Sequence, residues 1–170
     1  MLSFNRLEES KTYLLQALGI AREAGERSAE GIILGNLGEV FLKLHRLEEG
    51  KECLLRAIEI CTIAIPSVSG IFGGMLGVLY ATEGSFEKAF EALEVGEPLA
   101  AVYILEHGKF LCTKAKVYHL GNQSKEAKKA LEHAEAIATE ANVTEDSDLG
   151  KVIAETKVFL SEKPSYLKPS

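Results

Sequence analysis

Residues 6–21 read RLEESKTYLLQALGIA, and residues 46–61 read RLEEGKECLLRAIEIC. The two stretches are identical at nine of sixteen positions, at an offset of 40 residues. Weaker copies follow at 85–100 (SFEKAFEALEVGEPLA) and at 122–138 (NQSKEAKKALEHAEAIA). A repeat of this length indicates one supersecondary unit that is stacked several times.

Partner segments lie between these copies, at 30–46, 69–84 and 108–122. Apolar residues in 46–61 recur at helical spacing and form one stripe. The predicted unit is therefore helix–turn–helix, with a first helix from each partner segment and a second helix from each copy. Such a unit cannot bury its apolar faces alone, so stacked units must share a continuous core. The fold class predicted is all-α.

The pattern predicts at least seven helices and no sheet, within a single array over residues 1–163. Pro98 should end or kink the helix that starts at 86 near Gly96. Ser147 or Asp146 is a natural N-cap for a C-terminal capping helix. The expected units are the second helix of a partial repeat (6–24), repeats 28–63, 67–97 and 103–141, a capping helix (148–162) and an irregular tail (164–170). The expected helices are 6–24, 28–45, 47–63, 67–83, 86–97, 103–120, 124–141 and 148–162.

The small and large positions of these units resemble the tetratricopeptide repeat over roughly residues 6–141. The positions that carry the resemblance are small residues in the first helices (Gly38, Gly77, Ala115), an aromatic three residues later (Phe41, Tyr80, Tyr118), and a small–large–small set in the second helices (Ser10, Leu14, Ala17; Gly50, Leu54, Ala57; Ala89, Leu93, Gly96; Ala127, Leu131, Ala134). The usual period of the family is 34 residues. The longer period here is similar to that of kinesin light chains and many bacterial regulatory proteins. The resemblance implies a right-handed α-solenoid.

Composition and motifs argue against several classes of function. The net charge is −6 and the isoelectric point about 5.3, which disfavours a nucleic-acid binder. The three cysteines have no CxxC spacing, so neither a disulfide framework nor a metal site is expected. No phosphate loop and no nucleophile signature is present, so we expect no catalytic residues, no cofactor and no enzyme activity.

Residues 60–82 contain no charged side chain, and their length would suffice to span a bilayer. Pro66 would break a helix in this stretch, and several glycines and serines follow it. We therefore expect a buried pair of helices here and no membrane association. The N-terminus has no basic segment followed by an apolar run, so no signal peptide is expected, and the expected location is cytoplasmic.

The resemblance implies that the first helices line a concave groove that binds a peptide or helix of a protein partner. Asn36 stands where the family often uses an amide to bind a peptide backbone. The basic residues of the chaperone-binding members are not reproduced, so a chaperone tail is disfavoured. The groove residues implied in this way are Asn36, Glu39, Lys43, Ile71, Met75, Val78, Lys109, Lys116 and His119.

The helix at 6–24 matches a second helix, yet no first helix precedes it in the sequence. We therefore expect an exposed apolar edge formed by Tyr13, Leu14, Ala17 and Leu18. Four explanations remain open: the chain is cut from a longer array, a second copy pairs through this edge as a homodimer, the C-terminal tail folds over it, or the patch is tolerated.

Two functions follow as hypotheses. The first is a non-enzymatic module that binds a protein segment in the groove. The alternative is a regulatory or self-assembly segment of a larger signalling protein, which acts through intramolecular or homo-oligomeric contacts.

Overall fold

A computed structural model describes residues 2–162, and within this range it shows eight α-helices and no strand. The all-α prediction is thereby confirmed. The helices are α1 (Leu2–Glu23), α2 (Arg27–Lys43), α3 (Leu47–Ala64), α4 (Pro66–Thr82), α5 (Phe86–Ala100), α6 (Ile104–Leu120), α7 (Ser124–Glu140) and α8 (Asp148–Ser161). The helix α1 begins four residues before its predicted start. The tail predicted to be irregular, 164–170, lies outside the described residues.

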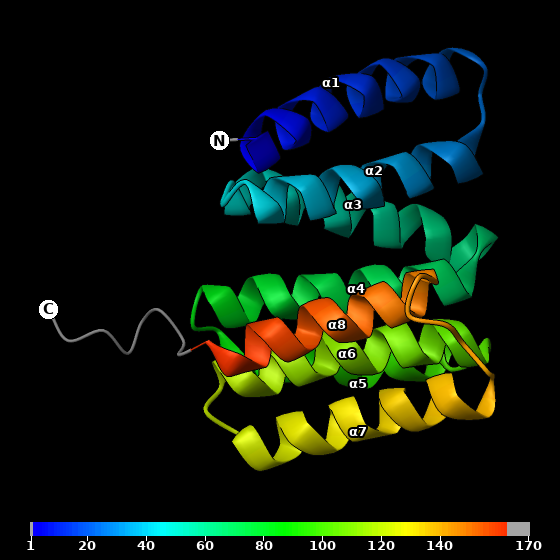
Figure 1. Ribbon diagram of the computed structural model, residues 1–170. Coiled ribbons are helices and arrows are strands. Elements are labelled where there is room, and N and C mark those ends of the chain that lie inside the picture. Colours follow the sequence, from blue (N-terminus) through cyan, green and yellow to red (C-terminus); the bar gives the residue numbers. More distant parts are fainter. Residues whose placement is uncertain (1, 163–170) are drawn as a thin grey trace, which may run out of the picture.

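The helices stack as consecutive hairpins, α2 with α3, α4 with α5 and α6 with α7 (Figure 1). Each first helix after α2 also packs against the preceding second helix, as α4 does against α3. The first helices α2, α4 and α6 form one layer, and α8 continues it by packing against α6 and α7. This arrangement confirms a helical-repeat solenoid, and the position of α8 is that of a C-terminal cap.

Five of the interhelical turns share one backbone conformation. In each turn a residue with positive φ lies two positions after the helix, and the next amide donates back to a carbonyl in the last turn, as Arg46 does to Phe41 (2.9 Å). This left-handed turn satisfies carbonyl groups that the helix end leaves unpaired. Its residues with positive φ are Gly25, His45, Gly84, Asn122 and Asn142.

Pro66 separates α3 from α4 and occupies the first turn of α4. A proline at this position costs no hydrogen bond, because the first amides of a helix have no partner inside it. The uncharged run is therefore split between two packed helices, as expected. Of the helices described, none combines the length and apolar character needed to cross a bilayer.

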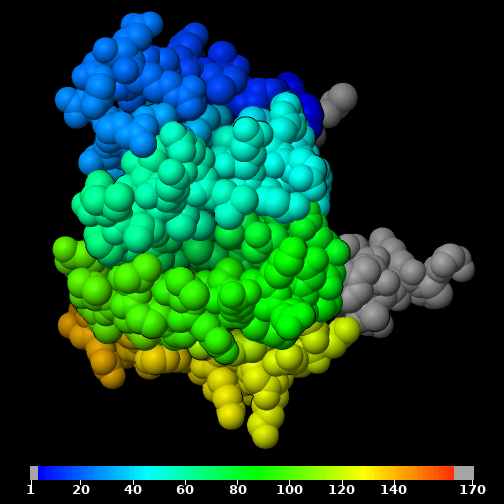
Figure 2. All heavy atoms as spheres, turned by 180° about the vertical axis from the view of Figure 1, so that it is seen from behind, coloured from blue at the N-terminus to red at the C-terminus, as the bar shows by residue number. Residues whose placement is uncertain are grey.

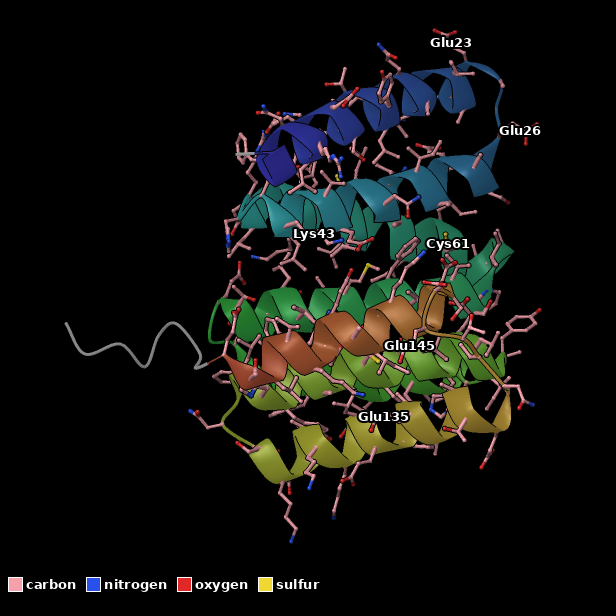
Figure 3. The ribbon with its side chains drawn as sticks, viewed as in Figure 1. Glu23, Glu26, Lys43, Cys61, Glu135 and Glu145 are labelled. Atoms are coloured by element: carbon pink, nitrogen blue, oxygen red, sulfur yellow. The ribbon has the colours of Figure 1, made fainter. Side chains whose placement is uncertain are left out.

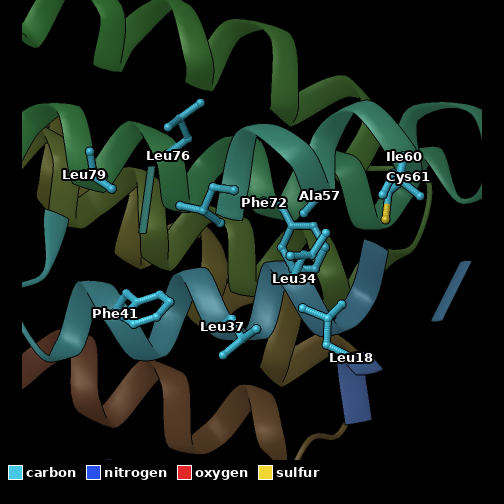
Figure 4. Packing of buried hydrophobic residues seen from close by; sticks show 11 residues of the cluster. Leu18, Leu34, Leu37, Phe41, Ala57, Ile60, Cys61, Phe72, Leu76 and Leu79 are labelled. Atoms are coloured by element: carbon cyan, nitrogen blue, oxygen red, sulfur yellow. The ribbon is translucent and has the colours of Figure 1, made fainter. Parts of the chain in front are cut away.

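The core consists of three clusters that follow one another along the stack. The first contains residues of α1, α2, α3 and α4, among them Leu18, Leu37 and Phe72 (Figure 4). The second joins α4, α5 and α6 around Phe110, and the third joins α6, α7 and α8 around Leu149. Because each cluster uses only neighbouring helices, the stability of the array depends on contacts between adjacent units.

The helix α5 continues past Gly96 to Ala100, so the prediction that Pro98 would end it near Gly96 was wrong. Pro98 is exposed and lies in the last turn, where it removes only one helical hydrogen bond. Gly96 is also pressed against α4, since a Cβ built on it would lie 2.7 Å from the carbonyl oxygen of Gly70. This close helix contact holds the α5 backbone in place on both sides of the proline.

Candidate partner-binding groove

The nine predicted groove residues lie on the three first helices, which form the layer that α8 continues (Figure 1). We call this set the first-helix surface. It comprises Asn36, Glu39 and Lys43 on α2, Ile71, Met75 and Val78 on α4, and Lys109, Lys116 and His119 on α6.

Glycines allow the first helices to lie close together under this surface. A Cβ on Gly35 of α2 would lie 2.0 Å from the ring of Phe72 on α4. In the next pair, a Cβ on Gly74 would lie 2.9 Å from the ring of Phe110 on α6. Each glycine therefore accommodates an aromatic ring from the following first helix.

The middle of the first-helix surface is apolar. Ile71, Met75 and Val78 are all half-buried. Met75 packs against the first core cluster, while Ile71 and Val78 pack against the second. Neighbouring helices thus cover part of this wall and leave part of it accessible.

Two of the lysines on this surface have carboxylate partners on their own helices. Lys43 lies 2.8 Å from Glu39, and Lys109 lies 3.0 Å from Glu106 (Figure 3 labels Lys43). Both pairs have helical spacing and are partly exposed, so each is worth little to stability. Asn36, on α2, is exposed.

Lys116 has a different environment from the other two lysines. Its ammonium nitrogen lies 5.9 Å from the centre of the Phe159 ring of α8, and burial lowers the pKa of the lysine. The carboxylates of Glu155 and Glu39 partly oppose this shift from a distance, whereas the charge of Lys43 adds to it. Among residues 2–162, the carboxylates that influence Lys116 act by charge and not through a side-chain hydrogen bond.

His119 is also held by α8. Its Nε2 lies 2.8 Å from the carbonyl oxygen of Glu162, and its ring meets that of Phe159 edge-on at 5.7 Å. The C-terminal helix therefore covers part of the predicted site on α6. No local pattern predicts this contact, because Phe159 is forty residues away from His119 along the chain.

The opposite face, formed by the second helices, carries grooves that sequence reasoning missed (Figure 2). A cavity of about 450 Å³ lies between α3 and α5, and residues of α4 form its base. Leu55 and Val95 line it and are 48% and 65% exposed. A second cavity, of about 630 Å³, lies between α1 and α3. Apolar residues such as Leu55 and Val95, which lie next to the stripe of buried residues on their helices, could have indicated these grooves.

The predicted N-terminal edge is only partly exposed. Tyr13 is 63% exposed, Leu14 and Ala17 are half-buried, and Leu18 is 6% exposed. The expectation that Leu18 is exposed was wrong, because this side chain points into the first core cluster, on the side of α1 that faces α2.

A polar cluster on another part of the surface joins α5 to α6. Glu97 accepts from Lys114 (2.6 Å) and lies 3.2 Å from Nε2 of His107. Burial opposes the ionisation of Glu97, but the hydrogen bonds with Lys114 and His107 outweigh it and lower the pKa of the carboxyl group. These contacts tie two helices together, which gives the cluster a structural role.

The three cysteines are free, and burial raises the pKa of each thiol. A raised pKa removes the thiolate that nucleophilic chemistry needs. In the part of the chain that the structure describes, no group of histidine, cysteine and acidic residues could hold a metal ion.

A family model of the tetratricopeptide repeat matches residues 33–62, which cover most of α2 and α3. The match supports membership of the tetratricopeptide-repeat superfamily, whose repeats generally mediate protein–protein interactions and typically act as non-enzymatic scaffolds. No curated protein and no solved structure matches the chain significantly.

Proposed function

We propose that this protein is a non-enzymatic interaction module that binds a peptide or helix of a partner protein on its first-helix surface. The observation that carries the proposal is the half-buried apolar wall of Ile71, Met75 and Val78 beside Lys116. An apolar wall of this kind suits a segment with apolar anchors at helical or extended spacing. The adaptable side chain of Met75 suits partners of more than one shape.

The charge around the wall indicates a partner segment with acidic residues. Among the described residues, carboxylates act on Lys116 by charge and not through a side-chain hydrogen bond, and its surroundings are partly desolvated. A carboxylate from a partner would place a counter-charge closer to Lys116 than Glu155 and Glu39 do, where water screens it weakly. A cytoplasmic location forms part of the proposal, because free thiols such as Cys53 persist under reducing conditions.

A double substitution on the wall tests the proposal. Met75→Asp with Val78→Asp places two charges on the wall and should abolish capture of protein partners by the immobilised chain. Ile63→Asp is the matched control, because Ile63 is 90% exposed on α3 and lies outside the first-helix surface. Circular dichroism establishes that each variant is folded. A folded double variant that retains every partner would show that the first-helix surface is not the site.

Lys116→Gln tests the charge preference separately. The glutamine keeps a polar side chain but removes the positive charge. Selection from a library of displayed peptides should then yield fewer acidic residues than selection with the unmodified chain. An unchanged acidic preference would assign that preference to other lysines.

The alternative, a regulatory or self-assembly segment, is favoured by one observation. Phe4, Tyr13 and Ile20 are exposed on α1 at 56%, 63% and 68%. Light scattering over a range of concentrations separates the alternatives. Self-association that Ile20→Glu removes, without capture of any other protein, would favour the second function.

A further inference from the structure

The helices α1 and α3 are copies of one another in sequence, so α3 shows how a second helix of this protein is covered by its neighbours. At the offset of 40 residues, Tyr13 corresponds to Cys53, Ala17 to Ala57 and Ile20 to Ile60. These three pairs lie on one side of their helices, because three- and four-residue spacings return to the same face.

In α3 this side is covered. Ala57 is fully buried, Ile60 is 6% exposed and Cys53 is partly buried. The helix that covers this side is α2, since a Cβ built on Gly31 would lie 2.7 Å from Sγ of Cys61 and 2.8 Å from Cγ2 of Ile60. A first helix therefore packs closely on this side of α3.

In α1 the corresponding side is open. Ile20 is 68% exposed and Tyr13 63% exposed, and Ala17 is half-buried. The other side of α1 is closed, with Leu18 and Ala21 each 6% exposed. Among the described helices, α1 packs only against α2. The open side of α1 is thus the side that a first helix covers in α3.

We propose that this open side of α1, defined by Tyr13, Ala17 and Ile20, binds a helix of a partner. The bound helix would pack on α1 as the first helix α2 packs on α3. This helix would run antiparallel to α1, as α2 runs against α3. The surface is separate from the first-helix surface, so the inference stands independently of the proposed function.

The way α2 covers α3 also specifies the small residues of the docked helix. Gly31 meets Ile60 and, seven residues later, Gly38 meets Leu54, with a Cβ on Gly38 lying 2.6 Å from Cγ of Leu54. The equivalents on α1, Ile20 and Leu14, are the same residue types. The docked helix therefore needs small residues seven positions apart, and larger ones would prevent a close approach.

A second copy of α1 does not meet this requirement. Two α1 helices that faced each other would bring Tyr13 and Ile20 of one copy against the same bulky residues of the other. The side chains would hold the backbones apart. The complementary partner is therefore a helix with glycine or alanine at these positions. A symmetric pair of α1 helices does not fulfil this requirement.

A labelled peptide with the sequence of residues 26–46 serves as the probe, because it contains Gly31 and Gly38 at the required spacing. Fluorescence anisotropy should show saturable binding to the full chain. Ile20→Glu in the chain should weaken binding about tenfold or more, since it places a charge in the apolar contact. Ile63→Glu is the matched control and should leave binding unchanged. A probe with Gly31→Leu and Gly38→Leu should not bind.

An isolated helix of this length is only marginally stable in water, so a second measurement supports the first. In a fusion, the same segment replaces residues 1–6 and is joined directly before Leu7, which reproduces the natural Arg46–Leu47 junction. The melting temperature should rise, and Ile20→Glu should cancel the rise. The proposal is overturned if neither saturable binding nor a higher melting temperature is seen. It is also overturned if Ile20→Glu leaves both unchanged, or if light scattering shows a dimer that depends on Ile20.

Discussion

Single glycines decide how closely the helices of this protein approach. Gly70 of α4 faces α5 so closely that a Cβ on it would lie 2.6 Å from the amide nitrogen of Ala100 and from the carbonyl oxygen of Gly96. Backbone atoms cannot move aside as a flexible side chain can. Gly19 of α1 has no atom within 4 Å of its Cβ position, so the same residue type has no packing role there.

Gly70→Ala and Gly19→Ala should therefore have opposite effects on the free energy of unfolding. Gly70→Ala should lower it by about 1–3 kcal/mol, because the new methyl group overpacks the contact with α5. Gly19→Ala should raise it by up to about 1 kcal/mol, because alanine is the better helix former at an exposed position. Urea denaturation measures both changes, and equal effects would contradict the close contact between α4 and α5.

Glu30 is the buried charge of the α1–α2 hairpin. Its carboxylate accepts from Arg22 of α1 (3.0 Å) and from Arg27 (2.7 Å), while its side chain is only 8% exposed. The hydrogen bond from Arg22 is the main reason why the pKa of Glu30 is lowered, although burial opposes the shift.

A lowered pKa in the folded state makes stability depend on pH. The contribution of Glu30 is fully present above the unfolded pKa, about 4.3, and is lost as the pH falls through the lower folded pKa. Glu30→Gln should therefore lower the melting temperature at pH 7, and the difference from the unmodified chain should shrink in acid. Glu39→Gln is the control, because Glu39 is itself exposed and forms its ion pair with the exposed Lys43. A difference at pH 7 that persists at pH 3 would show that the carboxylate charge is unimportant.

The helix α8 begins with a side-chain N-cap that the sequence predicts. The hydroxyl of Ser147 accepts a hydrogen bond from the amide of Gly150 (3.0 Å), which decides between the two predicted N-caps. From this start, α8 places Thr156 and Phe159 against α6. The cap thus fixes the helix that covers part of the first-helix surface.

Ser147→Ala should destabilise α8 by about 1 kcal/mol, because one amide of its first turn loses its partner. Hydrogen exchange should quicken at the amides of α8 more than at those of α4. Ser161→Ala is the control, since its hydroxyl only donates to the carbonyl of Val158 at the other end of the helix. Equal exchange in the two variants would indicate that packing, and not the cap, holds the start of α8.

At the scale of the whole molecule, packing is uneven along the array. The central helix α4 packs against α2, α3, α5 and α6, whereas α1 packs only against α2 among the described helices. Regions with few buried contacts open with a smaller free energy than the core.

Native-state hydrogen exchange should therefore find the amides of α1 exchanging fastest among the long helices and those of α4 slowest. The reason is that opening α1 breaks one helix contact, while opening α4 breaks four. Protection factors in α1 equal to those in α4 would contradict this order and would indicate that a further contact covers α1.

The sequence by itself determined the helices and their order. Helical periodicity, Pro66 and Ser147 are local signals, so six of the seven predicted helices from 28 to 162 agree with the structure to within two residues at each end. The exception is α5, where the local rule for Pro98 failed because contacts with α4 support the helix. The small residues of the repeat, such as Gly38 and Gly77, also predicted where two helices pack closely, because a larger side chain would not fit there.

The tertiary structure decided which faces are open. Leu18 and Ile20 are both apolar and two residues apart on α1, yet one is buried and the other exposed, because α2 covers a single side of the helix. Likewise, only the packing of α8 reveals that Lys116 and His119 meet Phe159. Exposure depends on neighbours that are distant in the chain, and local periodicity contains no information about which side those neighbours occupy.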